Sequence, residues 1–144
     1  MAFMAFNHSV NVVGFVRNNQ KYCMTCAWAM QVDYDKVLLL LGAQSVTGNK
    51  ILKGDIIGVS ALSKYQRDIA LQIGDGHSDE MDKLNGVEYQ VSTDALYILN
   101  AARIMKVRVI EVMHLKGIES DNLIYGEIVE KIETVLPFLN MSDI

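Results

Sequence analysis

The chain has 144 residues, of which 51% are apolar and 21% are charged, so its composition indicates one globular domain and excludes an intrinsically disordered chain. The net charge of -4 at pH 7 argues against a nucleic-acid partner, which would require a clustered basic patch. No signal peptide is evident, and the longest apolar run, residues 37–43, is too short to span a bilayer, so we expect a cytoplasmic protein without a membrane partner.

Apolar and polar residues alternate with a period of two along most of the chain, which is typical of β-strands. Residues 17–20 supply turn chemistry after the first strand, and residues 116–121 form a hairpin-like loop between the last two. The phase of the alternation reverses near Glu111, which predicts a β-bulge. The strands are predicted at residues 9–16, 21–30, 36–43, 55–62, 101–114 and 122–132, and the third, apolar on both faces, is expected to be central.

Three short helices are predicted between these strands. The first begins near Thr47 and ends at Gly54, while Ser63 and Ser78 can cap the second and the third. The side chains expected to point inward from the last two helices are Tyr65, Ile69, Ile73, Met81 and Leu84. This succession of strands and short helices predicts a mainly β fold, a closed or partly closed antiparallel barrel.

The only two cysteines, Cys23 and Cys26, have the C-x-x-C spacing of redox and zinc sites. Within a strand, however, their side chains point to opposite faces and their Cα atoms lie roughly 10 Å apart. A disulfide requires Cα atoms within about 7 Å. The three histidines have no zinc-like spacing, so we expect no metal site and interpret both cysteines as apolar packing residues.

Residues 44–50 follow the central strand and open the first predicted helix. Backbone N–H groups, the hydroxyls of Ser45 and Thr47, and the ammonium of Lys50 suit an anion at such a point, although ordinary helix capping is the alternative. No Ser-His-Asp or Cys-His-Asn arrangement identifies a catalytic residue. An enzyme with this sequence would therefore rely on a bound cofactor for its chemistry.

Several segments occur in a recognisable order between about residue 8 and residue 132. They are Met24-Thr-Cys-Ala-Trp28, the apolar strand at residues 37–41, Ser45-Val-Thr47, residues 55–60, Asp82-Lys83-Leu84 and residues 123–129. This ordered set resembles the flavin reductase-like, FMN-binding split-barrel family, with flavoredoxin-type members most similar. The resemblance covers nearly the whole chain.

The resemblance implies a six-stranded antiparallel Greek-key split barrel with short inserted helices, in which residues 1–144 form one FMN-binding domain of a homodimer. The residues expected along the isoalloxazine, largely through backbone groups, are Met24, Thr25, Cys26, Ala27 and Trp28. Those expected to hold the phosphate and ribityl groups are Ser45, Thr47, Gly48, Asn49 and Lys50. Lys83 and His114 would contact the second substrate.

The family's usual activity implies an oxidoreductase that takes electrons from NAD(P)H, or from a protein donor, and reduces flavin, ferric iron or another acceptor. Three positions depart from the family pattern: Lys36 stands where a proline often follows the aspartate, and two others concern the second substrate. Asp79 stands where an arginine is often found, and Asp121-Asn122 stands where a histidine is usual. Both positions are associated with nicotinamide or substrate contacts, so a non-catalytic flavin-binding protein or electron carrier is one alternative. A small β-barrel that binds another ligand, such as haem, is a second.

Overall fold

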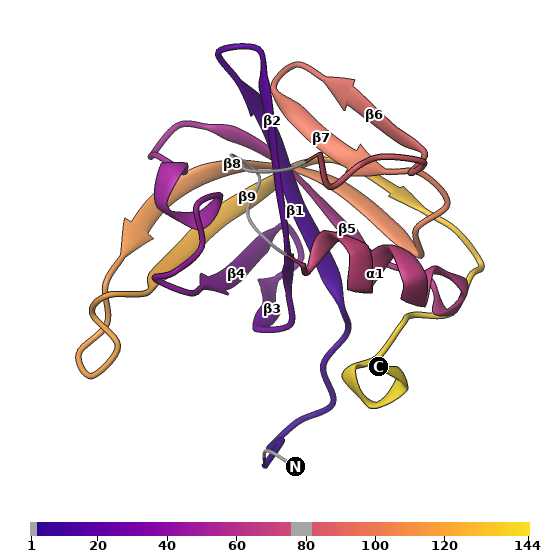
Figure 1. Cartoon of the computed structure of the whole chain (residues 1–144). Coiled ribbons are helices and arrows are strands. Elements are labelled where there is room, and N and C mark those ends of the chain that lie inside the picture. Colours follow the sequence, from indigo (N-terminus) through magenta and orange to yellow (C-terminus); the bar gives the residue numbers. More distant parts are fainter. Residues whose placement is uncertain (1–2, 76–81) are drawn as a thin grey trace.

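The computed structural model describes residues 3–75 and 82–144. In these residues nine strands form one antiparallel sheet that curls into a split barrel (Figure 1). The strand order is β3-β4-β9-β8-β5-β1-β7-β6, and β2 pairs with β1. The strands are β1 Asn11–Arg17, β2 Gln20–Cys26, β3 Ala29–Asp33, β4 Lys36–Leu41, β5 Ile56–Ala61, β6 Tyr89–Ser92, β7 Ala95–Ile98, β8 Arg103–Met113 and β9 Asn122–Glu133.

The predicted barrel is therefore confirmed, but its predicted count of six strands is wrong. The segment predicted as one strand at residues 21–30 bends between β2 and β3, where Ala29 N donates to Ala27 O (3.0 Å) and Leu40 N donates to Trp28 O (2.9 Å). The hairpin of β6 and β7 was not predicted, because strands of four residues are too short to establish a period.

The β6–β7 hairpin packs against the barrel at two glycines. A Cβ atom on Gly58 would lie 2.1 Å from Leu96 O, and one on Gly14 would lie 2.8 Å from the same oxygen. Only glycine leaves room for the backbone of β7 at these two positions. The hairpin thus depends on a contact between residues far apart in the sequence.

The helical segments are short: η1 Gly48–Lys50, η2 Lys64–Gln66, α1 Arg67–Ile73 and η3 Met141–Asp143. The helix predicted from Thr47 to Gly54 is wrong beyond one turn, because Ile51 is already extended. The second predicted helix corresponds to η2 and α1, with Gly74 after its end, although Tyr65 is exposed and was wrongly expected to point inward. Ser78 and Met81, predicted for the third helix, lie outside the described residues.

The two larger of three apolar clusters among the described residues lie on opposite faces of the curled sheet. One fills the barrel and includes Phe15, Cys26 and Leu39. The other lies between the outer face of the barrel and α1, and includes Cys23 and Ile73. The two cysteines are thus buried thiols on opposite faces, as predicted, and no disulfide joins them. Burial raises the pKa of the Cys26 thiol to about 12.

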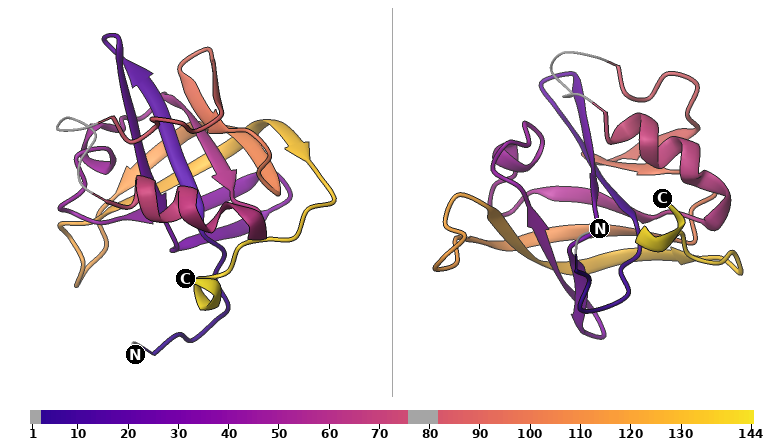
Figure 2. Two further views of the ribbon diagram at one scale, coloured as in Figure 1. Left: turned by 45° about the vertical axis from the view of Figure 1, so that its right-hand side comes forward. Right: turned by 60° about the horizontal axis from the view of Figure 1, so that its bottom comes forward.

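The last residues of the chain lie beside the start of β1 and close to α1 (Figure 2). Val10 N donates to Leu139 O (2.8 Å), and Leu139 N donates to Leu62 O (2.9 Å). Leu139 is fully buried, so this segment is anchored by both its backbone and its side chain. Within residues 3–75 and 82–144, no helix has the length and apolar character that crossing a membrane would require.

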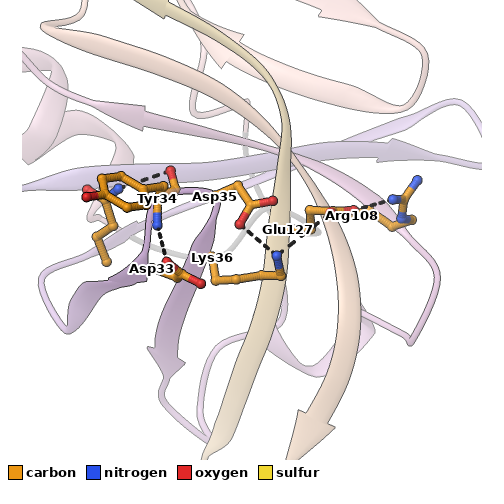
Figure 3. Close-up of polar contacts among 7 residues, drawn as sticks. Asp33, Tyr34, Asp35, Lys36, Arg108 and Glu127 are labelled. Carbon is orange, nitrogen blue, oxygen red and sulfur yellow. Dashed lines mark hydrogen bonds and ion pairs between the residues drawn. The ribbon is translucent and has the colours of Figure 1, made fainter.

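The long strands β8 and β9 form the hairpin predicted around residues 116–121, and their pairing shifts register between Val109 and Glu111, as predicted. A charged network of four residues, Asp35, Lys36, Arg108 and Glu127, crosses β4, β9 and β8 (Figure 3). Lys36 Nζ lies 2.7 Å from Asp35 Oδ1 and 3.8 Å from Glu127 Oε2, and Arg108 pairs with the same glutamate. The charges of this Lys36 network compensate one another.

Candidate functional site

The candidate site begins at the edge of β2. Among the described residues β2 pairs with β1 alone, so its other edge is available to other segments. At that edge Cys23 O accepts a hydrogen bond from Thr47 Oγ1 (3.3 Å) and another from Lys83 Nζ (3.1 Å). Three segments distant in sequence therefore meet at one carbonyl oxygen. We call this group of Cys23, Thr47 and Lys83 the Cys23 junction.

The turn that contains Thr47 is held in shape by its own polar groups. Ser45 Oγ accepts a hydrogen bond from Gly48 N (2.9 Å) and lies 3.0 Å from Met24 Sδ. A Cβ atom on Gly48 would lie 2.9 Å from Leu41 Cβ, so this position requires glycine for close packing. The predicted phosphate turn therefore does lie against the predicted flavin strand.

The far end of the turn is joined to the start of β9. Asn49 Nδ2 donates to Ala43 O (2.7 Å), and Asn49 Oδ1 accepts from Asn122 Nδ2 (2.8 Å). The side chain of Lys50 is exposed, and its Nζ lies 5.7 Å from the centre of the Tyr22 ring. Lys50 thus contacts an aromatic face in a cation–π geometry and does not join the Cys23 junction.

A cavity of about 490 Å³ lies further along β2, between that strand, α1 and the C-terminal segment. This volume falls in the range of about 300 to about 1,000 Å³ that is typical of small-molecule sites. Most of its wall is apolar, and Thr25 and Asp75 are its polar side chains. The lining residues are Val10, Thr25, Ala27, Ala70, Leu71, Gly74, Asp75, Met141 and Ile144.

The side chains of the five residues predicted along the isoalloxazine do not all lie on one face, because side chains alternate along a strand. Thr25 and Ala27 line the cavity, whereas Cys26 lies in the barrel core and Met24 packs against it. Trp28 is half-exposed, and its ring meets His8 edge-on at a centroid distance of 5.0 Å. Met24 and Cys26 could therefore contact a ligand at this edge only through their backbone groups.

His114, predicted on the substrate side, directly follows β8 and is exposed. Its Nδ1 lies 3.2 Å from Asp121 O. The carboxylate of Asp121 accepts a hydrogen bond from Ala43 N (2.9 Å), at the start of the turn. His114 is thereby linked to the turn through Asp121 and not through a contact of its own.

Lys83 has an unusual electrostatic environment. Its side chain is buried, with 6% exposed, and its ammonium donates to a neutral carbonyl. Burial lowers the pKa of Lys83, while the nearby Cys23 and Asp75 act in the opposite direction. No ion pair with Lys83 is present among the described residues.

Sequence reasoning missed the cavity residues on α1 and in the C-terminal segment. Ala70, Leu71 and Met141 are small or apolar side chains whose local pattern indicates packing and nothing else. The one available signal was the glycine that follows α1, Gly74, which lies close to Thr25. In the described part of the chain, no three histidine, cysteine or carboxylate side chains stand together as a metal site would require.

The fold and these contacts define a split barrel with a cavity of about 490 Å³ beside β2. Comparison with protein families then identifies the class: the model of the flavin reductase like domain matches residues 3–136. The chain therefore belongs to the flavin reductase-like domain family. No curated protein matches it by sequence.

Solved structures share the fold at low sequence identity. An FMN-binding protein from Thermus thermophilus is 18% identical with a TM-score of 0.79, over 91% of this chain and 73% of that one. The NADH:FAD oxidoreductase SgcE6 from Streptomyces globisporus C-1027 is 20% identical with a TM-score of 0.78, over 90% and 77%. Flavoredoxin from Methanosarcina acetivorans is 15% identical with a TM-score of 0.79, over 92% and 72%.

Proposed function

We propose that this protein is an FMN-binding oxidoreductase that uses NAD(P)H to reduce flavin, ferric iron or another acceptor. The observation that carries the proposal is the position of the cavity. It lies along the same strand edge that holds the hydroxyl-bearing turn and a buried lysine. Similar structures include an FMN-binding protein and an NADH:FAD oxidoreductase, which supports a flavin and a nicotinamide donor.

The residues present fit a flavin mononucleotide. The cavity has the volume of a small-molecule site, and its apolar wall of Ala27, Ala70 and Leu71 suits a planar aromatic ring. The turn at residues 45–50 offers hydroxyl and amide groups, and Lys83 offers a cation, to a phosphate. When bound, the flavin would supply the hydride and electron transfer itself.

The chain's own residues would bind and orient the cofactor. The edge of β2 near Thr25 and Ala27 would align with the ring, and residues 45–50 would lie towards the phosphate and ribityl groups. The wall from α1 and Met141 would exclude water from one side of the cavity. His114, joined to the turn through Asp121, would stand on the substrate side.

We also propose that residues 1–144 act as one domain of a homodimer. The edge strand β3 and its neighbourhood expose large apolar side chains. Met30 is 64% exposed, Tyr34 is 93% exposed, and Ile132 of β9 is 53% exposed. These three residues also border a second cavity, of about 300 Å³. A second copy would cover this surface, and sedimentation as a monomer of about 16 kDa would contradict the dimer.

Two measurements test the function. An absorbance scan of the purified protein, repeated after adding FMN, should show a bound flavin spectrum; a protein that takes up no flavin would contradict the proposal, and a haem spectrum would replace it. Stopped-flow mixing of the FMN-loaded protein with NADH and with NADPH should then bleach the flavin absorbance. If neither nucleotide reduces the flavin, the protein is an electron carrier or a non-catalytic flavin binder.

A further inference from the structure

The cavity of about 300 Å³ lies at one end of the barrel and has no part in the proposed oxidoreductase activity. Its wall includes Asn11, Ala61, Arg103 and Glu133, which begin or end four of the strands. It shares no lining residue with the cavity beside β2. The mouth of a β-barrel is a frequent position for a small-molecule site, and we call this one the barrel-mouth cavity.

The floor of the barrel-mouth cavity is apolar. Leu39 and Val59 belong to the core that fills the barrel, and Ala29 and Ile128 pack against that core. An apolar cavity of about 150 Å³ holds a molecule of the size of benzene. The barrel-mouth cavity therefore has room for a longer apolar body with a polar group at its end.

The charged side chains of the cavity wall carry an excess of positive charge. They are two cations, Arg103 and Lys131, and one anion, Glu133. Arg103 Nε lies 3.7 Å from Glu133 Oε2, so these two charges compensate each other. Lys131 forms no ion pair among the described residues, in contrast to its neighbours on β8 and β9. The ammonium of Lys131 is therefore available to an anion.

A β-bulge in β9 turns Lys131 towards this cavity. The pairing of β9 with β8 leaves Val129 unpaired, between Ile128 and Glu130. After the bulge, Lys131 stands opposite Met105, whose side chain packs against the barrel core. Residues that stand opposite each other point to the same face of a sheet, so Lys131 faces the inside of the barrel mouth.

This orientation of Lys131 is not what packing alone would favour. Ile128 also faces the barrel core, and strict alternation from it would bring Ile132 to the inner face and turn Lys131 away. With the bulge, Ile132 is 53% exposed while a lysine lines the cavity. Bulges that redirect a side chain are frequent next to functional sites. A position that breaks the local pattern in this way indicates a role in binding.

We propose that the barrel-mouth cavity binds a small apolar monocarboxylate, with its apolar body on the floor and its carboxylate at Lys131. A charge-assisted hydrogen bond from the ammonium would hold the carboxylate, and burial of the apolar body would supply the rest of the affinity. A second copy of the chain lying over Met30 and Tyr34 would enclose this ligand and leave both contacts in place. The site is separate from the flavin cavity and does not depend on the proposed oxidoreductase activity.

The test compares octanoate with 1-octanol and octylamine, which have the same chain and a neutral or a positive head group. Isothermal titration calorimetry would give the dissociation constants of all three for the wild type and for Lys131→Met, Lys131→Glu and Lys116→Met. Lys116 is an exposed lysine in the loop between β8 and β9, so Lys116→Met is the matched control for the loss of one positive charge. Thermal unfolding of each variant checks that it is folded.

We expect Lys131→Met to bind octanoate about 3- to 10-fold more weakly than the wild type, and 1-octanol within about twofold. Lys131→Glu should reverse the preference and bind octylamine more tightly than octanoate, because the charge at the rim is reversed. Lys116→Met should change all three affinities by less than about twofold. Equal losses of octanoate and 1-octanol in Lys131→Met would overturn the inference, as would a wild type that binds neither.

Two further measurements locate the ligand. Ala29→Leu fills part of the floor and should weaken octanoate and 1-octanol alike, by about tenfold or more. Unchanged octanoate binding in a folded Ala29→Leu protein would overturn the inference. The Lys131 variants alter an exposed side chain, so they decide the question if Ala29→Leu does not fold.

Saturating FMN should leave the octanoate affinity unchanged, because the two cavities share no lining residue. Competition between FMN and octanoate would place octanoate in the flavin cavity and would overturn the inference. A protein that binds octanoate at Lys131 but takes up no flavin would refute the proposed oxidoreductase activity and leave the barrel-mouth site in place.

Discussion

The Cys23 junction and the Lys36 network each contain a lysine that joins segments distant in the sequence. The two lysines differ in their partners: Lys36 pairs with carboxylates, and Lys83 donates to a neutral carbonyl. Lys36 contacts two carboxylates at the protein surface, and its hydrogen bond with Asp35 raises the pKa of Lys36 and lowers that of Asp35 (Figure 3). Lys83 is buried against a carbonyl, and burial lowers its pKa. The network is complete within the chain, whereas the junction holds a charge that the described residues do not neutralise.

This difference separates a structural feature from a candidate binding feature. Exposed ion pairs join β4, β9 and β8 at small net gain, because water already solvates both partners. A buried cation that pairs with no carboxylate among the described residues is costly to the free protein, and such perturbed groups cluster at functional sites. The buried lysine, and not the larger cluster of charges, is therefore the candidate for a binding residue.

The largest expected effect comes from reversing the charge at the junction. Lys83→Glu would place an isolated carboxylate beside Cys23 O, where two oxygen atoms would face each other without a donor between them. We expect a loss of about 3 to 5 kcal/mol in the free energy of unfolding, measured by urea titration. Lys36→Glu, at the exposed network, is the control and should cost much less; similar losses would remove the contrast between the two regions.

The pH dependence of stability should differ between the two lysines. Because the pKa of Lys83 is below its unfolded value of 10.5, the unfolded state binds the extra proton, and wild-type stability should rise with pH up to that value. The pKa of Lys36 is raised above 10.5, so the contribution of Lys36 to folding stability is constant below pH 10.5 and is lost only at higher pH.

Urea titrations of the wild type, Lys83→Met and Lys36→Met at about pH 7 and about pH 10 would measure both effects. From about pH 7 to about pH 10, the free energy of unfolding of the wild type should rise relative to that of Lys83→Met. The free energy of unfolding of the wild type relative to Lys36→Met should stay constant over the same range. If the free energy of unfolding of the wild type relative to Lys83→Met does not change with pH, the pKa of Lys83 is not lowered in the folded protein.

Much of the fold could be predicted from the sequence, because alternation with a period of two reports which strand face is buried. The separation of Cys23 from Cys26 and the bulge beside Glu111 both followed from that period. The β6–β7 hairpin did not, because it depends on the packing of Leu96 over Gly14 and Gly58 from distant strands. The bend after β2 depends in the same way on a hydrogen bond from Leu40.

The candidate site could be predicted in part. Residues 45–50 and the strand at Met24 do lie together, as the ordered motifs implied. The direction of each side chain could not be read from motif order, so Lys50 and Lys83 were assigned without knowledge of which one is buried. The cavity wall from Met141 was missed because a lone apolar residue near a chain end carries no local signal.

The two cysteines allow a smaller test of the junction. Its hydrogen bonds are accepted by the backbone oxygen of Cys23, so replacing the side chain should leave them in place. Cys23→Ala should cost roughly 1 kcal/mol of stability from lost packing, and the double variant with Cys26→Ala should bind FMN within about threefold of the wild type. A large loss of flavin binding in the double variant would instead restore a role for the thiols.

The smallest effect is expected at the surface network. Arg108→Gln removes one partner of Glu127, while Lys36 remains near the same carboxylate. We expect a loss of roughly 0.2 to 1 kcal/mol in the free energy of unfolding at low ionic strength, and close to none in about 1 M salt, where charges are screened within about 3 Å. By contrast, the loss from Lys83→Glu should persist in the same salt, because ions do not reach a buried group. A salt-sensitive Lys83→Glu and a salt-insensitive Arg108→Gln would reverse the roles assigned to the two regions.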